Sequence, residues 1–124
     1  MTRYPTVEEA LAIHARVVEL FGGSPGVRDR GALESALARP RSGYYRDLIE
    51  EAAALWESLS QNHPFLDGNK RAAVTIAAAF LRMNGYRLVF SDEAAHSFLI
   101  GLYESRRMKS QELDRWLRLH ASKA

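Results

Sequence analysis

Apolar residues recur along most of this chain at intervals of three and four positions, the spacing that places side chains on one face of an α-helix. Glycine, proline and helix-capping residues interrupt this pattern at several points. The first helix, for example, begins at a capping box of Thr6 with Glu9 and ends before a glycine-rich turn. We predict six helices, over residues 6–21, 29–39, 47–62, 69–84, 91–105 and 110–121.

The segment at residues 69–84 differs from the others because its pattern has almost no polar face. Between positions 72 and 81 nearly every residue is alanine, valine, isoleucine, phenylalanine or leucine. A helix that is apolar on all sides is expected to be buried on all sides. We therefore predict that residues 69–84 form the central helix, and that packing holds the loop before them in place.

Two short stretches do not follow the helical pattern. Residues 86–90 alternate as a β-strand does, but the sequence offers no evident partner strand. Residues 41–46 are irregular and indicate a small hairpin or flap, in which Tyr44 and Tyr45 are candidates for docking a substrate protein. The predicted fold is a single all-α domain over residues 1–124, an orthogonal bundle of about six helices with a short flap or β-like segment.

Composition restricts the class of protein. A chain of 124 residues, of which 47% are hydrophobic and 26% charged, can bury its own core. It contains no cysteine, which excludes disulfides, thiolate catalysis and zinc–thiolate sites. Neither a signal-peptide core nor a run long enough to span a membrane is evident. We expect a cytoplasmic protein without membrane contacts.

The net charge is +2, and most of the cations are arginine, which suits phosphate and carboxylate recognition. They gather in two clusters, Arg28, Arg30, Arg39, Arg41 and Arg46 in the first half, and Arg106, Arg107, Lys109, Arg115 and Arg118 near the end. Acidic residues are interleaved with both clusters, as is typical of a solvated mixed surface. We therefore expect no direct binding to nucleic acid.

One loop, residues 63–71, carries most of the candidate chemistry; we call it the motif loop. Its sequence is His-Pro-Phe-Leu-Asp-Gly-Asn-Lys-Arg, and the predicted central helix begins inside it. N–H donors and cations at a helix N-terminus are suited to binding an anionic phosphate chain. The two cations oppose the helix dipole there, and such a local conflict is typical of a functional site. The loop therefore indicates phosphoryl or nucleotidyl transfer.

Each position of the motif loop has a predicted role. His63 can take a proton from an attacking hydroxyl group, and Asp67 is an oxygen ligand suited to Mg²⁺. Phe65, between polar neighbours, is the expected anchor of the loop in the core. The predicted nucleotide- and phosphate-binding residues are Gly68, Asn69, Lys70 and Arg71, although Asn69 can alternatively fix the loop.

The other histidines favour structural roles. His14 and His120 lie on apolar stripes and are expected to be packed, whereas His96 lies off its apolar face and is expected at the surface. A metal site shared by His63 and Asp67 lacks a third and fourth ligand at suitable spacing. The glycine-rich nucleotide motifs GxGxxG and GxxxxGK[ST] are absent.

The motif loop resembles the signature HPFx[D/E]GN[G/K]R of the Fic/Doc family and agrees with it at every defined position. The resemblance extends to most of the chain and is greatest to the small death-on-curing toxins of type II toxin–antitoxin systems. The further segments that carry it are Glu8-Glu9, Ile13-His14, residues 21–26, residues 28–31 and residues 84–88. It implies an all-α fold with the motif between two central helices, and transfer of part of a nucleoside triphosphate to a protein hydroxyl.

Two positions bear on which part is transferred. Most Fic proteins transfer AMP and have glycine where this chain has Lys70, and arginine where it has Val74. Death-on-curing toxins share the lysine and lack that arginine. The resemblance therefore implies a kinase that uses ATP with Mg²⁺ to phosphorylate a threonine of elongation factor Tu and so blocks translation. Gly68 stands where a member of the toxin branch has alanine and agrees with the AMP-transfer pattern, so protein adenylyltransferase is the alternative.

The resemblance also implies a partner. Many Fic enzymes carry an inhibitory helix with the pattern [S/T]xxxE[G/N], which this sequence lacks because no serine or threonine has a glutamate four positions later. Inhibition is then expected from a cognate, Phd-like antitoxin whose disordered segment folds on the toxin.

Two other classes of function remain open. Arg115 and His120 fit the loose R-x₄-H pattern of some helical ribonucleases, which makes a ribonuclease toxin a less favoured alternative. A binding module without chemistry is the third, although binding alone does not require a base, a carboxylate and two cations in one loop.

Overall fold

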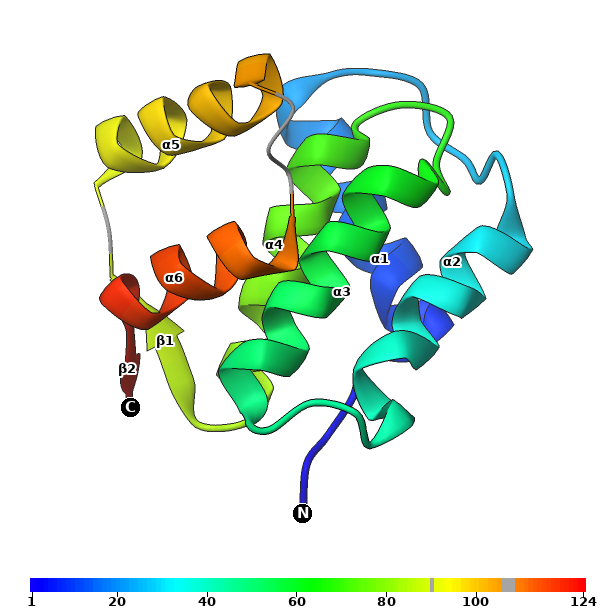
Figure 1. Ribbon diagram of the computed structural model, residues 1–124. Helices are drawn as coiled ribbons and strands as arrows, with labels where there is room; N and C mark the ends of the chain where they lie inside the picture. Colours follow the sequence, from blue (N-terminus) through cyan, green and yellow to red (C-terminus); the bar gives the residue numbers. More distant parts are fainter. Residues whose placement is uncertain (90, 106–108) are drawn as a thin grey trace.

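A computed structural model describes residues 1–89, 91–105 and 109–124 as a helical bundle with a small sheet (Figure 1). The elements are α1 (Val7–Phe21), α2 (Arg30–Ala38), the 3₁₀ helix η1 (Arg39–Ser42), α3 (Leu48–Asn62), α4 (Asn69–Met83), β1 (Tyr86–Leu88), α5 (Asp92–Ser105), α6 (Ser110–His120) and β2 (Ala121–Lys123). Phe90 of the expected strand pattern and Arg106 and Arg107 of the second cluster lie outside the described residues, as does the side chain of His96.

The six predicted α-helices are confirmed, and side-chain caps mark the starts of α1, α2 and α3. Thr6 and Glu9 form the predicted reciprocal capping box at α1. Asp29 and Asp47 accept backbone N–H groups at the starts of α2 and α3. Among the residues that the structure describes, no helix is both long and apolar enough to cross a membrane.

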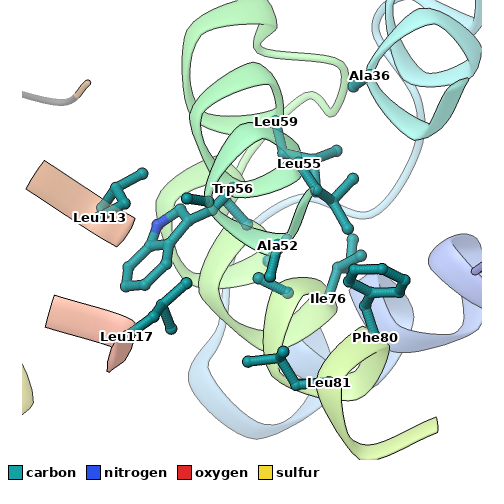
Figure 2. Close-up of a cluster of buried hydrophobic side chains, with 14 of the residues drawn as sticks. Ala36, Ala52, Leu55, Trp56, Leu59, Ile76, Phe80, Leu81, Leu113 and Leu117 are labelled. Carbon is teal, nitrogen blue, oxygen red and sulfur yellow. The ribbon is translucent and has the colours of Figure 1, made fainter. Parts of the chain in front are cut away.

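Helix α3, rather than α4, is the most buried helix, which corrects the prediction for residues 69–84. α3 contacts α2, η1, α4 and α6, whereas α4 contacts α1, α3 and β1. Trp56 of α3 points toward α6, and Leu55 points toward Ile76 and Phe80 of α4 (Figure 2). The pattern of α4 overstated its burial because five of its 15 residues are alanine, which favours helices whether or not it is covered. Its exposed side includes Lys70, Arg71 and Thr75.

The strand pattern after α4 has a partner that the sequence did not indicate. β1 pairs with β2 antiparallel, with Tyr86 opposite Lys123 and Leu88 opposite Ala121. The sixth helix therefore ends at His120, and the segment after it forms the sheet. Three residues, Ala-Ser-Lys, are too few to show an alternating pattern, so this pairing could not be read from the sequence.

The expected hairpin at residues 41–46 is wrong. The second helix continues through Pro40 into η1, because proline at the start of a helical turn lacks no hydrogen bond there. The residues from Gly43 to the start of α3 are irregular and form no strand. This segment leads into the N-terminus of α3, at the bottom of Figure 1, while the motif loop leaves its C-terminus at the top.

Candidate active site

Two residues in the left-handed backbone region delimit the turn between α3 and α4. His63 ends α3 with φ 47° and ψ 56°, and Pro64 follows, which prevents the helix from continuing. Gly68 has φ 71° and ψ 21° and precedes the first residue of α4. A histidine in this region is uncommon, whereas glycine adopts it readily. These two backbone conformations therefore define where the turn begins and where it ends.

The segment between α1 and α2 supports the motif loop from behind. The Leu66 N–H donates to the Gly26 carbonyl at 3.1 Å, and the Arg28 N–H donates to the Pro64 carbonyl at 2.8 Å. The Arg28 side chain donates through Nε to the His63 carbonyl at 2.6 Å and through Nη2 to the Asn62 carbonyl at 2.8 Å. Arg28, expected among surface cations, thus caps the C-terminus of α3 and fixes the backbone of His63.

Asn69 and Phe65 hold the loop from inside. The Asn69 Oδ1 accepts the Phe65 N–H at 2.9 Å, and the Asn69 Nδ2 donates to the Phe65 carbonyl at 2.9 Å. The Phe65 side chain is 1% exposed, in agreement with an anchoring role. Of the two roles considered for Asn69, its side-chain amide serves to fix the loop, which leaves its backbone N–H for the predicted phosphate binding.

The Asp67 carboxylate is exposed and oriented by backbone donors. Oδ1 accepts the Gly68 N–H at 2.9 Å, and Oδ2 accepts the Ser24 N–H at 3.3 Å. A Cβ atom at Gly23 would lie 2.9 Å from Oδ2, so only glycine leaves room for this arrangement. The Gly68 N–H, expected to face a phosphate, is thus bound to Asp67 in this state.

Asp67 fits a magnesium ion that arrives with a nucleotide. The described residues hold no group of three or more histidine, aspartate or glutamate side chains that could bind a metal ion by themselves. Mg²⁺ is commonly held by one or two carboxylates together with phosphate oxygens and water. A single, exposed and oriented carboxylate meets that requirement.

A cleft of about 790 Å³ lies along the motif loop and the start of α4. One side is formed by His63, Leu66, Asp67, Gly68, Asn69, Lys70, Arg71 and Val74, and the other by Leu99, Ile100, Tyr103 and Glu104 of α5. The structure therefore brings together, at one cleft, all the predicted catalytic and phosphate-binding residues. The α5 side is mainly apolar, and no pattern in the sequence indicates that it lies there.

The two cations diverge across the cleft. Lys70 Nζ lies 4.4 Å from the ring centroid of Tyr103, and Arg71 Cζ lies 4.0 Å from that of Phe21. Burial raises the pKa of the Tyr103 phenol, so this group stays neutral beneath the lysine. Both cations are exposed and lie against aromatic rings. An exposed cation–ring contact is weak, so each side chain can leave its ring at a small cost in free energy when an anion binds.

Tyr44 and Tyr45 are not near this cleft. Together with Arg46, Asp114, Arg115 and other residues of α3 and α6 they line a second cleft of about 840 Å³. The Tyr45 hydroxyl accepts a hydrogen bond from Arg39 Nε at 2.7 Å. The structure thus does not bring the flap tyrosines together with the motif loop, because α3 separates them along its length.

Two of the remaining histidines behave as expected, whereas the side chain of His96 lies outside the described residues. His14 is buried and His120 is partly buried. The His120 Nδ1 lies 3.2 Å from the Val89 carbonyl, which it donates to, and its ring packs on Trp116. Arg115 is paired with Glu112 at 3.5 Å. These contacts give the R-x₄-H pattern a structural explanation.

The chain belongs to the Fic/DOC family, whose sequence profile it matches over residues 4–81. It is 42% identical over 93 residues to "Toxin Doc" of Mycolicibacterium smegmatis, a match that covers 71% of this chain and 69% of that protein. It is 36% identical over 97 residues to "Protein kinase doc" of Escherichia phage P1, covering 75% of this chain and 77% of that protein. The predicted family and its all-α fold are therefore confirmed.

Proposed function

We propose that this chain is a Doc-like toxin kinase that transfers the γ-phosphate of ATP to a hydroxyl group of a target protein. The observation that carries the proposal is Lys70, which lies in the cleft at the first turn of α4, with Val74 one turn later where AMP-transferring Fic proteins have arginine. The likeness to a protein named as a kinase supports it. Phosphotransfer by a Fic-family enzyme is the coarser statement that the family and the relative named as a kinase favour.

The residues of the cleft have distinct tasks in this reaction. The triphosphate binds at the N-terminus of α4, where its charge is stabilised by Lys70, Arg71 and the first N–H groups, which have no acceptor within the helix itself. As the target oxygen forms its bond to the γ-phosphorus, the bond to the β–γ bridging oxygen breaks and ADP leaves. His63, exposed at the cleft, takes the hydroxyl proton. Mg²⁺ held by Asp67 would supply neutralisation of the phosphate charge.

The proposed target is a threonine of elongation factor Tu, so that phosphorylation blocks translation in the cytoplasm. The proposed partner is a Phd-like antitoxin that inhibits the enzyme in trans. The likeness to a protein named as a toxin supports a cognate antitoxin. The family resemblance supports the identity of the target.

Transfer of label from ATP tests the proposal. Purified chain is incubated with elongation factor Tu, Mg²⁺ and ATP labelled at either the α or the γ position, with His63→Ala as the inactive control. We expect label on the target from γ-labelled ATP only. Label from α-labelled ATP alone would replace the kinase with the adenylyltransferase that Gly68 leaves open.

The remaining alternatives have their own controls. If His120→Ala abolished toxicity while His63→Ala did not, a ribonuclease would replace the kinase. If His63→Ala and Asp67→Ala both kept full toxicity, a binding module without chemistry would replace it.

A further inference from the structure

Helix α1 carries a buried histidine, His14, that the proposed reaction does not use. Its side chain is 3% exposed, and its Nε2 lies 2.8 Å from the backbone oxygen of Asp67. Since a carbonyl oxygen only accepts hydrogen bonds, Nε2 must carry the proton and donate it. The imidazole also stacks on Phe65, with ring centroids 3.8 Å apart and an interplanar angle of 3°. Two contacts thus fix this ring against the back of the motif loop.

The carbonyl that His14 holds belongs to the peptide bond between Asp67 and Gly68. This peptide is trans, so its C=O and N–H groups point in opposite directions. A carbonyl held toward α1 therefore directs the Gly68 N–H away from α1. That N–H donates to Asp67 Oδ1 at 2.9 Å, and both residues line the cleft.

Gly68 itself does not fix the orientation of this peptide. Glycine adopts negative and positive φ about equally well, so the peptide can turn over without a steric penalty. After such a turn the Asp67 carbonyl oxygen would face the cleft, where it would repel phosphate oxygens, and the N–H donor would be lost. The observed orientation is favoured because it gives the partly buried carbonyl a donor.

We infer that His14 is a positioning residue that locks the Asp67–Gly68 peptide with its N–H toward the cleft. In that orientation the N–H holds the Asp67 carboxylate or a bound phosphate oxygen. The inference rests on the proposed function to the extent that phosphates bind at this turn. His14 acts through the peptide and does not touch the reacting atoms.

Two substitutions separate the hydrogen bond from the packing of the ring. His14→Phe keeps an aromatic ring against Phe65 but has no donor, whereas His14→Gln keeps an N–H at similar reach but no ring. The corresponding change at the other packed histidine, His120→Phe, is the control. If His14→Phe does not fold, as judged by circular dichroism, His14→Leu takes its place as the variant without a donor.

The readouts are the affinity for magnesium and a non-hydrolysable ATP analogue, the kcat and KM of transfer, and the amide resonance and hydrogen exchange of Gly68. We expect His14→Phe to weaken binding of the ATP analogue by about tenfold. It should also shift the Gly68 amide resonance and speed the hydrogen exchange of that amide. His14→Gln should recover most of the affinity, and His120→Phe should match the wild type.

Unchanged affinity and an unchanged Gly68 resonance in His14→Phe would overturn the inference. Equal weakening by His14→Phe and His14→Gln would overturn it as well, because a donor at this position would then not restore binding. Failure of the proposed function shows separately, in the wild-type transfer assay. The affinity for the ATP analogue and the Gly68 amide resonance test the role of His14 whichever group of ATP is transferred.

Discussion

The side chains of Arg28, Asn69 and His14 all bind backbone atoms of the motif loop. They stabilise a turn in which His63 is left-handed, a conformation that costs a non-glycine residue about 1–2 kcal/mol. The position of the proposed catalytic groups thus depends on residues that need not touch a ligand. Substitutions of these residues should affect stability and transfer together.

Asn69→Asp tests the clamp on Phe65. The carboxylate can still accept the Phe65 N–H, but it places an oxygen where an N–H now donates to the Phe65 carbonyl at 2.9 Å. We expect a loss of about 1–3 kcal/mol in the free energy of unfolding, measured with urea. Gln111→Glu, the same change at an exposed position of α6, is the control and should stay within about 0.5 kcal/mol of the wild type.

Arg28→Ala tests the cap on α3. It removes two donors from the Asn62 and His63 carbonyls, and water replaces them because this side chain is exposed. We expect about 1 kcal/mol of lost stability and a lower kcat with little change in KM. Arg30→Ala removes a neighbouring cation whose ion pair with Glu34 is long, at 3.7 Å, and exposed. This control should change neither the stability nor the kcat. Equal kinetic effects in both variants would contradict the capping role.

Sequence reasoning identified the chemical groups of the site better than their supports. His63, Asp67 and the residues at the start of α4 are adjacent in the chain, so their shared location followed from one loop. His14 and Tyr103 come from α1 and α5, and apolar spacing shows that such residues are buried without showing what they touch. The contact of His14 with Asp67 joins residues far apart in the sequence, which no local pattern encodes.

At the scale of elements, Asp47 links two helices. Its carboxylate accepts the Glu50 N–H at the start of α3 and pairs with Arg118 of α6 at 2.9 Å. Burial raises the pKa of Asp47, but the hydrogen bond from Arg118 and that from Glu50 outweigh it, so the pKa lies below the usual 3.8. The charged form is thus favoured by folding, and its stabilisation is present above the unfolded pKa.

This linkage predicts a pH dependence that Asp47→Asn removes. The asparagine still caps α3 but cannot form the ion pair. Above about pH 5 the variant should be less stable than the wild type by at most about 1 kcal/mol, because the pair is partly exposed. The difference should disappear as the pH falls below the folded pKa of Asp47. Denaturant titrations at several pH values measure it, with Asp29→Asn, the cap of α2, as the control.

Elements were predictable where their signals are local. Capping residues and apolar spacing gave six helices with ends that the structure reproduces closely. The β1–β2 pairing was missed because it joins segments on either side of two helices. The burial of α3 was underestimated because two of its polar residues, Glu57 and Ser58, face partners from α6 and η1, such as the Ser110 N–H that Glu57 accepts at 2.6 Å.

At the scale of the whole molecule, the cleft lies where α3 ends, α4 begins and α5 passes over them. The relative position of α3 and α4 is set by their shared core, which also fixes the geometry between His63 and the first turn of α4. Figure 2 shows Leu55 in this core beside Ile76 and Phe80. Stability of the bundle and geometry of the site therefore depend on the same packing.

Leu55→Ala tests that dependence. The Leu55 side chain is 0% exposed, and its removal leaves a cavity between α3 and α4. We expect a loss of about 2–5 kcal/mol in the free energy of unfolding. Leu20→Ala makes the same change at a side chain that is 57% exposed and should stay within about 0.5 kcal/mol of the wild type. Because the same packing sets the position of His63 against the first turn of α4, transfer by Leu55→Ala should fall below the wild-type rate even at temperatures well below its own unfolding transition. A wild-type rate that persists up to that transition would contradict the dependence of the site on this packing.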